Sequence, residues 1–245
     1  MNNNILLATT FIILSLHASY TAHMNTSLTA SFSIGLGITT FDVIKQMVLT
    51  SMTQSNKPTS PLLFNFTDPQ NTLSKWIEVS DTVRVEGRSK ATLVPHIGYN
   101  YRSAIFFYLL NPQPSGACFA GVDYILDAWD LSAYTGVVID LHRQGQNSNF
   151  KLIFYGNCSE IFTCQSYESF FETSGERQQI KLPFSTFKPY FRGEPKFDLP
   201  SLDITQLSRF GIQSYGGIYA PTRQFGPGSI EIFTISAYKE DQLPA

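Results

Sequence analysis

Residues 182–193 read LPFSTFKPYFRG, and this stretch restricts the folds open to the chain. It combines four aromatic residues with two prolines: Phe184, Phe187, Tyr190, Phe191, Pro183 and Pro189. Proline fixes φ and removes a backbone donor, so the stretch is neither a long helix nor a central strand. Each aromatic ring buries on the order of 150–250 Å², so a loop this rich in rings is stable only against a larger body. We therefore expect a structured loop that crosses a β-sheet body with its rings turned inward.

Short apolar and alternating segments surround this loop on both sides. Residues 104–110 (AIFFYLL) form a continuous apolar run, which is typical of a strand covered on both faces. Residues 150–155 (FKLIFY) place Phe150, Leu152 and Phe154 on one face. In 166–172, Tyr167, Ser169 and Phe171 alternate with Glu168, Phe170 and Glu172, which predicts a dry side and a wet side. Further strands are expected at 62–66, 76–79, 83–85, 90–94, 118–122, 137–142, 210–214 and 229–238.

About ten strands at short spacing, with no long helix between them, favour an all-β fold, either a β-sandwich or a jelly roll. The chain of 245 residues divides most simply into a probable signal peptide (1–22), a poorly ordered leader and linker (23–61) and one β domain (62–240). One short amphipathic helix is compatible with the spacing of apolar residues in 41–52.

Composition excludes several classes of partner. Lys and Arg number 17 against 19 Asp and Glu, which leaves a formal net charge of -2. Proteins that bind nucleic acid usually carry a marked basic excess, so we expect no nucleic-acid partner. No polybasic membrane patch is present either.

The compartment is predicted from the first segment. Residues 5–16 (ILLATTFIILSL) form an apolar run too short to span a bilayer, so no stable membrane span is expected, and small residues follow it. This arrangement resembles a secretory signal peptide. A mitochondrial presequence is the alternative, but such segments are rich in arginine, and the first arginine here is Arg84. We expect the secretory pathway or secretion, with the mitochondrion as the alternative.

Sequons and cysteines fit that compartment. Asn25, Asn65 and Asn157 each begin an Asn-x-Ser/Thr sequon, and Asn65 and Asn157 fall within the predicted domain. Cys158 and Cys164 enclose five residues that a disulfide could close, whereas Cys118 sits in an apolar stretch and is expected to be a buried free thiol.

No catalytic pattern stands out, so no enzyme activity, metal or cofactor is expected. The chain lacks a Gly-x-Ser-x-Gly elbow and a phosphate-binding loop, and its histidines are scattered. His96 and His142 are interpreted as structural residues, and the Arg84, Glu86 and Arg88 cluster as a solvent-facing edge. A glycosidase would need two converging acids. The acidic residues are interpreted as turn or solvent-face residues: Asp81, Glu86, Asp123, Asp127, Asp130, Glu168 and Glu172.

Six blocks in order resemble the complex I intermediate-associated protein 30 family. They are WIEVSDTVRVEGRSKATL (76–93), AIFFYLLNPQPSGACFAGV (104–122), DLSAYTGVVIDLHRQGQN (130–147), SYESFF (166–171), IKLPFSTFKPYFRG (180–193) and LSRFGIQSYGGIYA (207–220). The resemblance is greatest to the divergent animal members. It implies a galactose-binding-domain-like β-sandwich without catalytic residues, and a chaperone-like role in assembly.

Two functional hypotheses follow. The first is a non-enzymatic module that binds an unidentified protein partner, with Tyr190, Arg192, Gln213 and Tyr215 as contact residues, because Arg and Tyr are common interface anchors. The alternative is a secretory-pathway module that binds a glycan by stacking it on Trp76 or Trp129, although two tryptophans in so aromatic a domain more often belong to the core.

Overall fold

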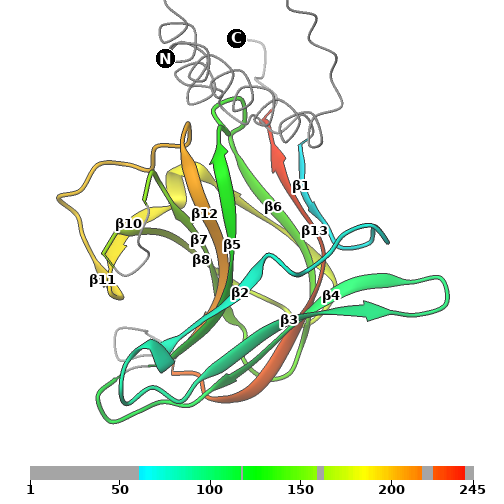
Figure 1. Cartoon of the computed structure of the whole chain (residues 1–245), viewed down its shortest axis with the longest axis horizontal. Helices are drawn as coiled ribbons and strands as arrows, with labels where there is room; N and C mark the ends of the chain where they lie inside the picture. The colour runs from blue at the N-terminus through cyan, green and yellow to red at the C-terminus, as the bar shows by residue number, and fades with distance from the viewer. Residues whose placement is uncertain (1–60, 117, 159–162, 217–222, 241–245) are drawn as a thin grey trace, which may run out of the picture. The chain divides into compact units, whose positions relative to one another are not determined.

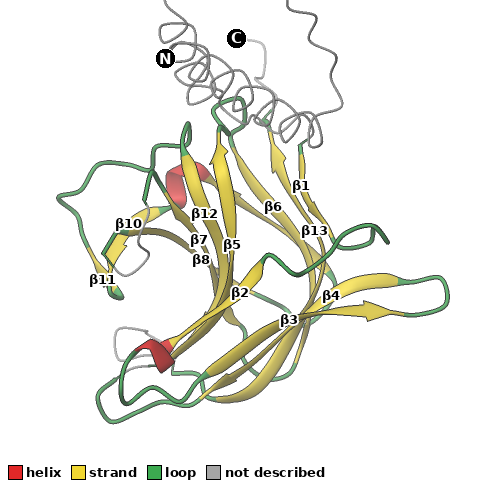
Figure 2. Ribbon diagram, viewed as in Figure 1, coloured by secondary structure: helices red, strands yellow, loops and turns green. Residues whose placement is uncertain are grey.

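Antiparallel pairing organises the chain into two stacked sheets. The computed structural model describes residues 61–116, 118–158, 163–216 and 223–240, all within the unit Thr53–Ala245. Within them, strands dominate and only two short 3₁₀ turns interrupt them, η1 (Asp81–Val83) and η2 (Phe184–Thr186) (Figure 2). The predicted signal peptide, the leader, Asn25 and the possible helix at 41–52 lie outside the described residues.

The smaller sheet has six strands in the order β3-β4-β13-β6-β9, and β1 also pairs with β13. Its members are β1 (Leu62–Asn65), β3 (Lys90–Ile97), β4 (Arg102–Leu110), β6 (Gly136–Gln144), β9 (Gln178–Pro183) and β13 (Gly226–Tyr238). β13 is the longest strand and lies at the centre, where it pairs with β4 through its first half and with β1 through its second half.

The larger sheet has seven strands in the order β11-β10-β8-β7-β12-β5-β2 (Figure 1). Its members are β2 (Trp76–Ser80), β5 (Phe119–Trp129), β7 (Asn149–Tyr155), β8 (Ser166–Glu172), β10 (Lys188–Phe191), β11 (Glu194–Pro195) and β12 (Leu207–Tyr215). All pairings in both sheets are antiparallel, which confirms the predicted all-β sandwich.

The core lies between the two sheets and is built from alternate residues of each strand. Phe150, Leu152 and Phe154 of β7 are almost completely buried, as their alternation predicted. Phe64 packs within 5.0 Å of the rings of Trp76 and Tyr124 and within 5.6 Å of Trp129 (centroid distances), so both tryptophans contribute to the core cluster. Free Cys118 is buried, as expected, and burial raises its pKa to about 11.

The 182–193 stretch crosses from the smaller sheet to the larger one. It ends β9, forms η2 and then continues as β10, which pairs with β8 next to the sheet edge. Phe187 is buried in the core, as expected, but Tyr190 is only half-buried and lies in β10 on the outer side of the larger sheet. Proline is tolerated in β10 because this strand is short and next to the sheet edge. The stretch is therefore not a central strand, as expected, but the prediction of a loop was wrong for residues 188–191.

The segment predicted as a strand at 83–85 forms part of a 3₁₀ turn and a loop instead. Asp81 has no solvent exposure and accepts hydrogen bonds from Ser89 N at 2.8 Å and Ser89 Oγ at 2.6 Å, which fold the loop back on itself. The interpretation of Asp81 as a solvent-face residue was therefore wrong. A Cβ on Gly87 would lie 1.9 Å from the Asp81 carbonyl oxygen, so only glycine fits at this position.

Candidate functional site

The larger sheet is curved around its outer face. Arg84 follows β2 at one edge of the sheet, and Arg192 lies in the β10–β11 turn at the other, yet an Arg84 Nη2 donates to the Arg192 carbonyl at 3.4 Å. In a flat sheet the edges would be about 29 Å apart, from six strand spacings of about 4.8 Å. The outer face is therefore the inside of the curve, and we call it the concave face.

The concave face is filled by residues that alternate with the core residues. Register pairs Gln213 with Lys151 and Lys151 with Phe170, and a second row pairs Asp123 with Gly211 and Gly211 with Ile153. Several of its polar side chains are buried although the core lies on the opposite side of the sheet. The face carries Asp123, Lys151, Tyr155, Glu168, Phe170, Tyr190, Arg209, Gln213 and Tyr215.

An ion pair lies at the centre of this face. Lys151 Nζ lies 2.6 Å from Glu168 Oε2, and the two side chains are only 9% and 5% exposed. Ser166 Oγ donates to the second oxygen, Oε1, at 2.8 Å. A buried charge is tolerated when it is paired and hydrogen-bonded, as this carboxylate is. Glu168 is therefore buried rather than on a wet side, and the prediction for this residue was wrong.

Three aromatic rings lie around this ion pair. Lys151 Nζ is 5.7 Å from the ring centroids of both Phe170 and Tyr215. Phe170 contacts Tyr215 at 5.2 Å and Tyr190 at 5.5 Å between centroids, although β8 and β12 are separated by β7. Burial raises the pKa of Tyr215 to about 12 and also raises that of Tyr190, to which the Glu168 charge adds. Both phenols therefore keep their protons at neutral pH and can donate hydrogen bonds.

Asp123 is the least satisfied polar group of the concave face. It is 2% exposed, and its Oδ2 has no hydrogen-bond partner among the described residues. Arg209 Nη1 lies 3.9 Å away, close enough for charge attraction but too far for a hydrogen bond. Burial raises the pKa of Asp123 to about 7, and the charges of Arg209 and Lys151 lower it only in part. Its interpretation as a turn or solvent-face residue was wrong.

Two glycines make room for polar side chains on this face. A Cβ on Gly211 would lie 2.2 Å from Asp123 Oδ1, and a Cβ on Gly121 would lie 3.0 Å from the Gln213 Cβ. Each glycine is the register partner of the side chain it accommodates. Asp123 and Gln213 therefore pack against the glycine of the neighbouring strand, and both are buried on this face of the sheet.

The structure brings three of the four predicted contact residues together. Tyr190, Gln213 and Tyr215 all belong to the concave face. Arg192 stays apart in the β10–β11 turn, with a φ of 54° and its guanidinium 5.2 Å from the Phe191 ring centroid. Sequence reasoning missed Asp123, Lys151, Glu168 and Phe170. A charged residue inside the apolar run FKLIFY was the one signal that pointed to Lys151.

The ends of two strands carry the predicted modification sites. Cys158 and Cys164 are joined by a disulfide that closes the β7–β8 connection. Asn157, beside it, is exposed. Asn65 is half-buried, and its Oδ1 accepts hydrogen bonds from Thr67 N at 3.1 Å and Thr67 Oγ1 at 2.7 Å.

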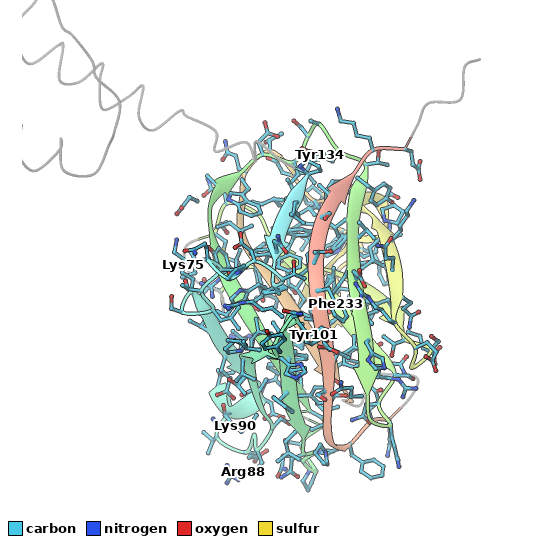
Figure 3. All side chains as sticks on the ribbon, turned by 90° about the vertical axis from the view of Figure 1, so that its right-hand side faces the viewer. Lys75, Arg88, Lys90, Tyr101, Tyr134 and Phe233 are labelled. Carbon is cyan, nitrogen blue, oxygen red and sulfur yellow. A yellow bond between two sulfur atoms is a disulfide. The ribbon has the colours of Figure 1, made fainter. Side chains whose placement is uncertain are left out.

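The outer face of the smaller sheet holds a different charged centre. Glu231 of β13 is buried and accepts hydrogen bonds from Ser103 Oγ at 2.5 Å and from Tyr101, while His96 Nδ1 lies 3.1 Å from its Oε1. Tyr101 and Phe233 lie side by side on this face (Figure 3), with centroids 6.2 Å apart. Burial raises the pKa of Glu231, but the hydrogen bonds outweigh it and lower the pKa overall. His96 therefore has a structural partner.

The parts of the chain that the structure describes contain no group of three His, Cys, Asp or Glu residues arranged to hold a metal ion. In the same residues, no helix has the length and apolar character that crossing a membrane requires.

Two solved structures of carbohydrate-binding modules are similar to this fold. The family 11 carbohydrate-binding module of the cellulase Lic26A-Cel5E from Clostridium thermocellum superposes with a TM-score of 0.53 at 14% identity, covering 74% of this chain and 97% of the module. The family 11 module from the same organism in complex with a β-1,3-1,4-mixed-linked tetrasaccharide gives a TM-score of 0.52 at 14% identity, covering 71% and 95%. The protein therefore has the galactose-binding-like β-sandwich fold of carbohydrate-binding modules.

The match to a protein family is more specific than the likeness of the fold. The model of the complex I intermediate-associated protein 30 (CIA30) family matches residues 64–232, so the chain belongs to this family. It is also similar to the uncharacterized protein C9E9.15 of Schizosaccharomyces pombe, with 31% identity over 96 residues. That alignment spans 38% of this chain and 39% of the relative.

Proposed function

We propose that the protein is a non-enzymatic binding module that holds a protein partner on its concave face, in a chaperone-like, assembly-related role. The family name, with its reference to an intermediate of complex I, supports the kind of role. The observation that carries the proposal is the group of rings Phe170, Tyr190 and Tyr215 around the buried Lys151–Glu168 pair. Aromatic groups around a desolvated centre are typical of the anchor regions of protein interfaces.

The contacts of the Glu168 carboxylate support a role without catalysis. A carboxylate that acts as a nucleophile or a general base must be able to reach the substrate. Both oxygens of Glu168 instead contact protein partners, Oε2 with Lys151 and Oε1 with Ser166, and the side chain is only 5% exposed. Asp123, the other buried acid of the face, belongs to β5, three strands away from β8 in the sheet.

The test compares two matched pairs of substitutions. Phe170→Ala with Tyr215→Ala removes two rings from the concave face, and Phe107→Ala with Leu109→Ala removes two exposed apolar side chains from β4 in the other sheet. The probe is a thermally unfolding enzyme of unrelated sequence, and light scattering measures its aggregation. The native protein is expected to suppress aggregation near one-to-one stoichiometry. The first pair is expected to lose at least about fivefold of that effect, equivalent to about 1 kcal/mol, and the second pair to keep it.

No suppression by the native protein would contradict the chaperone-like role. Equal losses in both pairs would instead contradict the concave face as the contact surface. The folded state of each variant is checked by circular dichroism, so that loss of structure is not mistaken for loss of binding.

A saccharide is the second candidate ligand, favoured by Asp123 and Gln213. Both polar side chains lie over glycines on the concave face, and Asp123 Oδ2 has no partner among the described residues. A carboxylate and an amide beside aromatic rings suit the hydroxyls and apolar face of a sugar. The mixed-linked tetrasaccharide named for the Clostridium module is a suitable calorimetric probe. Saccharide binding that Asp123→Ala abolishes would favour this candidate over the protein partner.

We also propose that the protein is directed to the secretory pathway and glycosylated at Asn65 and Asn157, with the mitochondrion as the alternative. The Cys158–Cys164 disulfide supports an oxidising compartment. Treatment of the cellular protein with an N-glycosidase tests this proposal. A shift in electrophoretic mobility is expected, and mitochondrial import without a shift would contradict it.

A further inference from the structure

A hollow lies beside η1, away from the centre of the concave face. Its volume is about 460 Å³, and it is lined by Thr82, Val83, Arg84, Val85, Gly87, Arg88 and Lys90. In Figure 3, the labelled residues Arg88 and Lys90 lie close together near the bottom of the view. Three of these seven residues are basic, in a chain whose formal net charge is -2. The lining of the hollow is therefore positively charged, whereas the chain as a whole has a negative formal charge.

The loop that forms the hollow is fixed from beneath. Buried Asp81 accepts hydrogen bonds from both the backbone and the hydroxyl of Ser89, and from Phe119 N at 3.3 Å. Arg84 N donates to the Asp81 carbonyl at 2.8 Å, and Gly87 N donates to the Arg84 carbonyl at 3.1 Å. The backbone of the loop is therefore in place before any ligand arrives, which lowers the entropy lost on binding.

The two guanidinium groups have no acidic partner among the described residues. Arg84 donates to the Arg192 carbonyl at 3.4 Å, and Arg88 donates to the Gly87 carbonyl at 3.0 Å. These contacts orient the arginines without neutralising them. Lys90 differs, because its Nζ lies 3.3 Å from Glu78 Oε2. Two guanidinium groups thus lie at the hollow without a salt bridge among the described residues, and the loop also contains one acidic residue, Glu86.

We propose that this hollow binds a small organic phosphate ester. A phosphate ester carries about -1.5 to -2 charges at pH 7, which matches two guanidinium groups, and arginine recognises such oxygens through paired N–H donors. The hollow is larger than one phosphate group requires, and the side chains of Val83 and Val85 are 51% and 96% exposed at it. They provide apolar contacts for the organic part. A sulfate ester shares the geometry but keeps its charge in acid.

Isothermal titration with three probes tests the proposal: phenyl phosphate, phenyl sulfate and inorganic phosphate. Phenyl phosphate is expected to bind more tightly than inorganic phosphate because it also contacts the valines. The variant Arg84→Gln with Arg88→Gln is expected to bind it at least about tenfold more weakly, since hydrogen bonds to charged groups contribute roughly 1.5–3 kcal/mol each. The control Lys181→Gln with Lys239→Gln removes the same charge elsewhere and is expected to leave binding unchanged.

The pH dependence distinguishes the two anions. Phosphate esters take up a proton near pH 6, so binding of phenyl phosphate is expected to weaken between pH 7 and pH 5 while that of phenyl sulfate stays level. Three results would overturn the proposal: equal weakening in the control variant, no affinity of the native protein for phenyl phosphate at millimolar concentration, or tighter binding of phenyl sulfate at pH 7. Binding to this hollow is independent of whether the concave face holds a protein partner.

Discussion

The two outer faces of the sandwich each bury an acidic side chain, but the hydrogen bonding and the pKa shift of that side chain differ between the faces. On the smaller sheet, Glu231 receives hydrogen bonds from Ser103 and Tyr101 and lies beside His96, and its pKa falls. On the concave face, Asp123 Oδ2 has no hydrogen-bond partner within the described parts of the chain, and the pKa of Asp123 rises to about 7. A satisfied carboxylate is what a structural role requires, whereas an unsatisfied one marks a position where a ligand could supply the missing donor. The comparison therefore supports the proposal that the concave face is the binding face.

The largest expected effect concerns the ion pair of the concave face. Lys151→Met leaves Glu168 buried without its counter-charge, and breaking such a pair costs about 3–5 kcal/mol of unfolding free energy. Urea denaturation measures the loss. In the double variant Lys151→Met with Glu168→Gln, much of that loss is expected to disappear because no buried charge is left. A single variant as stable as the native protein would show that Glu168 reaches solvent.

The next largest effect is the change in stability caused by Asp123→Asn, and it depends on pH. Its folded-state pKa of about 7 lies above its ordinary value of 3.8, so the folded state binds the proton more tightly and the native protein loses stability as pH rises from about 4 to 7. Asp123→Asn removes this loss. The variant is expected to gain on the order of 4 kcal/mol relative to the native protein between pH 4 and pH 8. Denaturant midpoints across that range measure the difference, and a constant difference would contradict the unsatisfied carboxyl.

Glu231→Gln is expected to have the smaller effect, with the opposite pH dependence. Because the pKa of Glu231 is lowered, its contribution to stability is present above the ordinary glutamate pKa and is lost as pH falls through the folded-state value. The variant should therefore be less stable at pH 7 by about 1–3 kcal/mol, as for a charged hydrogen-bonded group. The difference should shrink in acid. The same pH slope for both variants would remove the contrast between the two faces.

The sequence predicted the sandwich well because local alternation determines which residues of a strand face the core. Phe150, Leu152 and Phe154 lie in the core as expected. The charged centres were missed for a different reason. Whether Glu168 is wet or buried depends on Lys151 in the neighbouring strand and on the curvature of the whole sheet, and neither can be seen in the segment 166–172. Tyr190, Gln213 and Tyr215 were selected by residue type alone.

The contact between Arg84 and Arg192 has a mechanical consequence. It joins the two edges of the larger sheet at exposed positions through one long hydrogen bond. Such a bond contributes no more than about 1 kcal/mol, which is comparable to thermal energy. The curvature of the sheet therefore rests on the pairing of its seven strands rather than on this bond, and an Arg84→Gln variant is expected to keep the curved sheet.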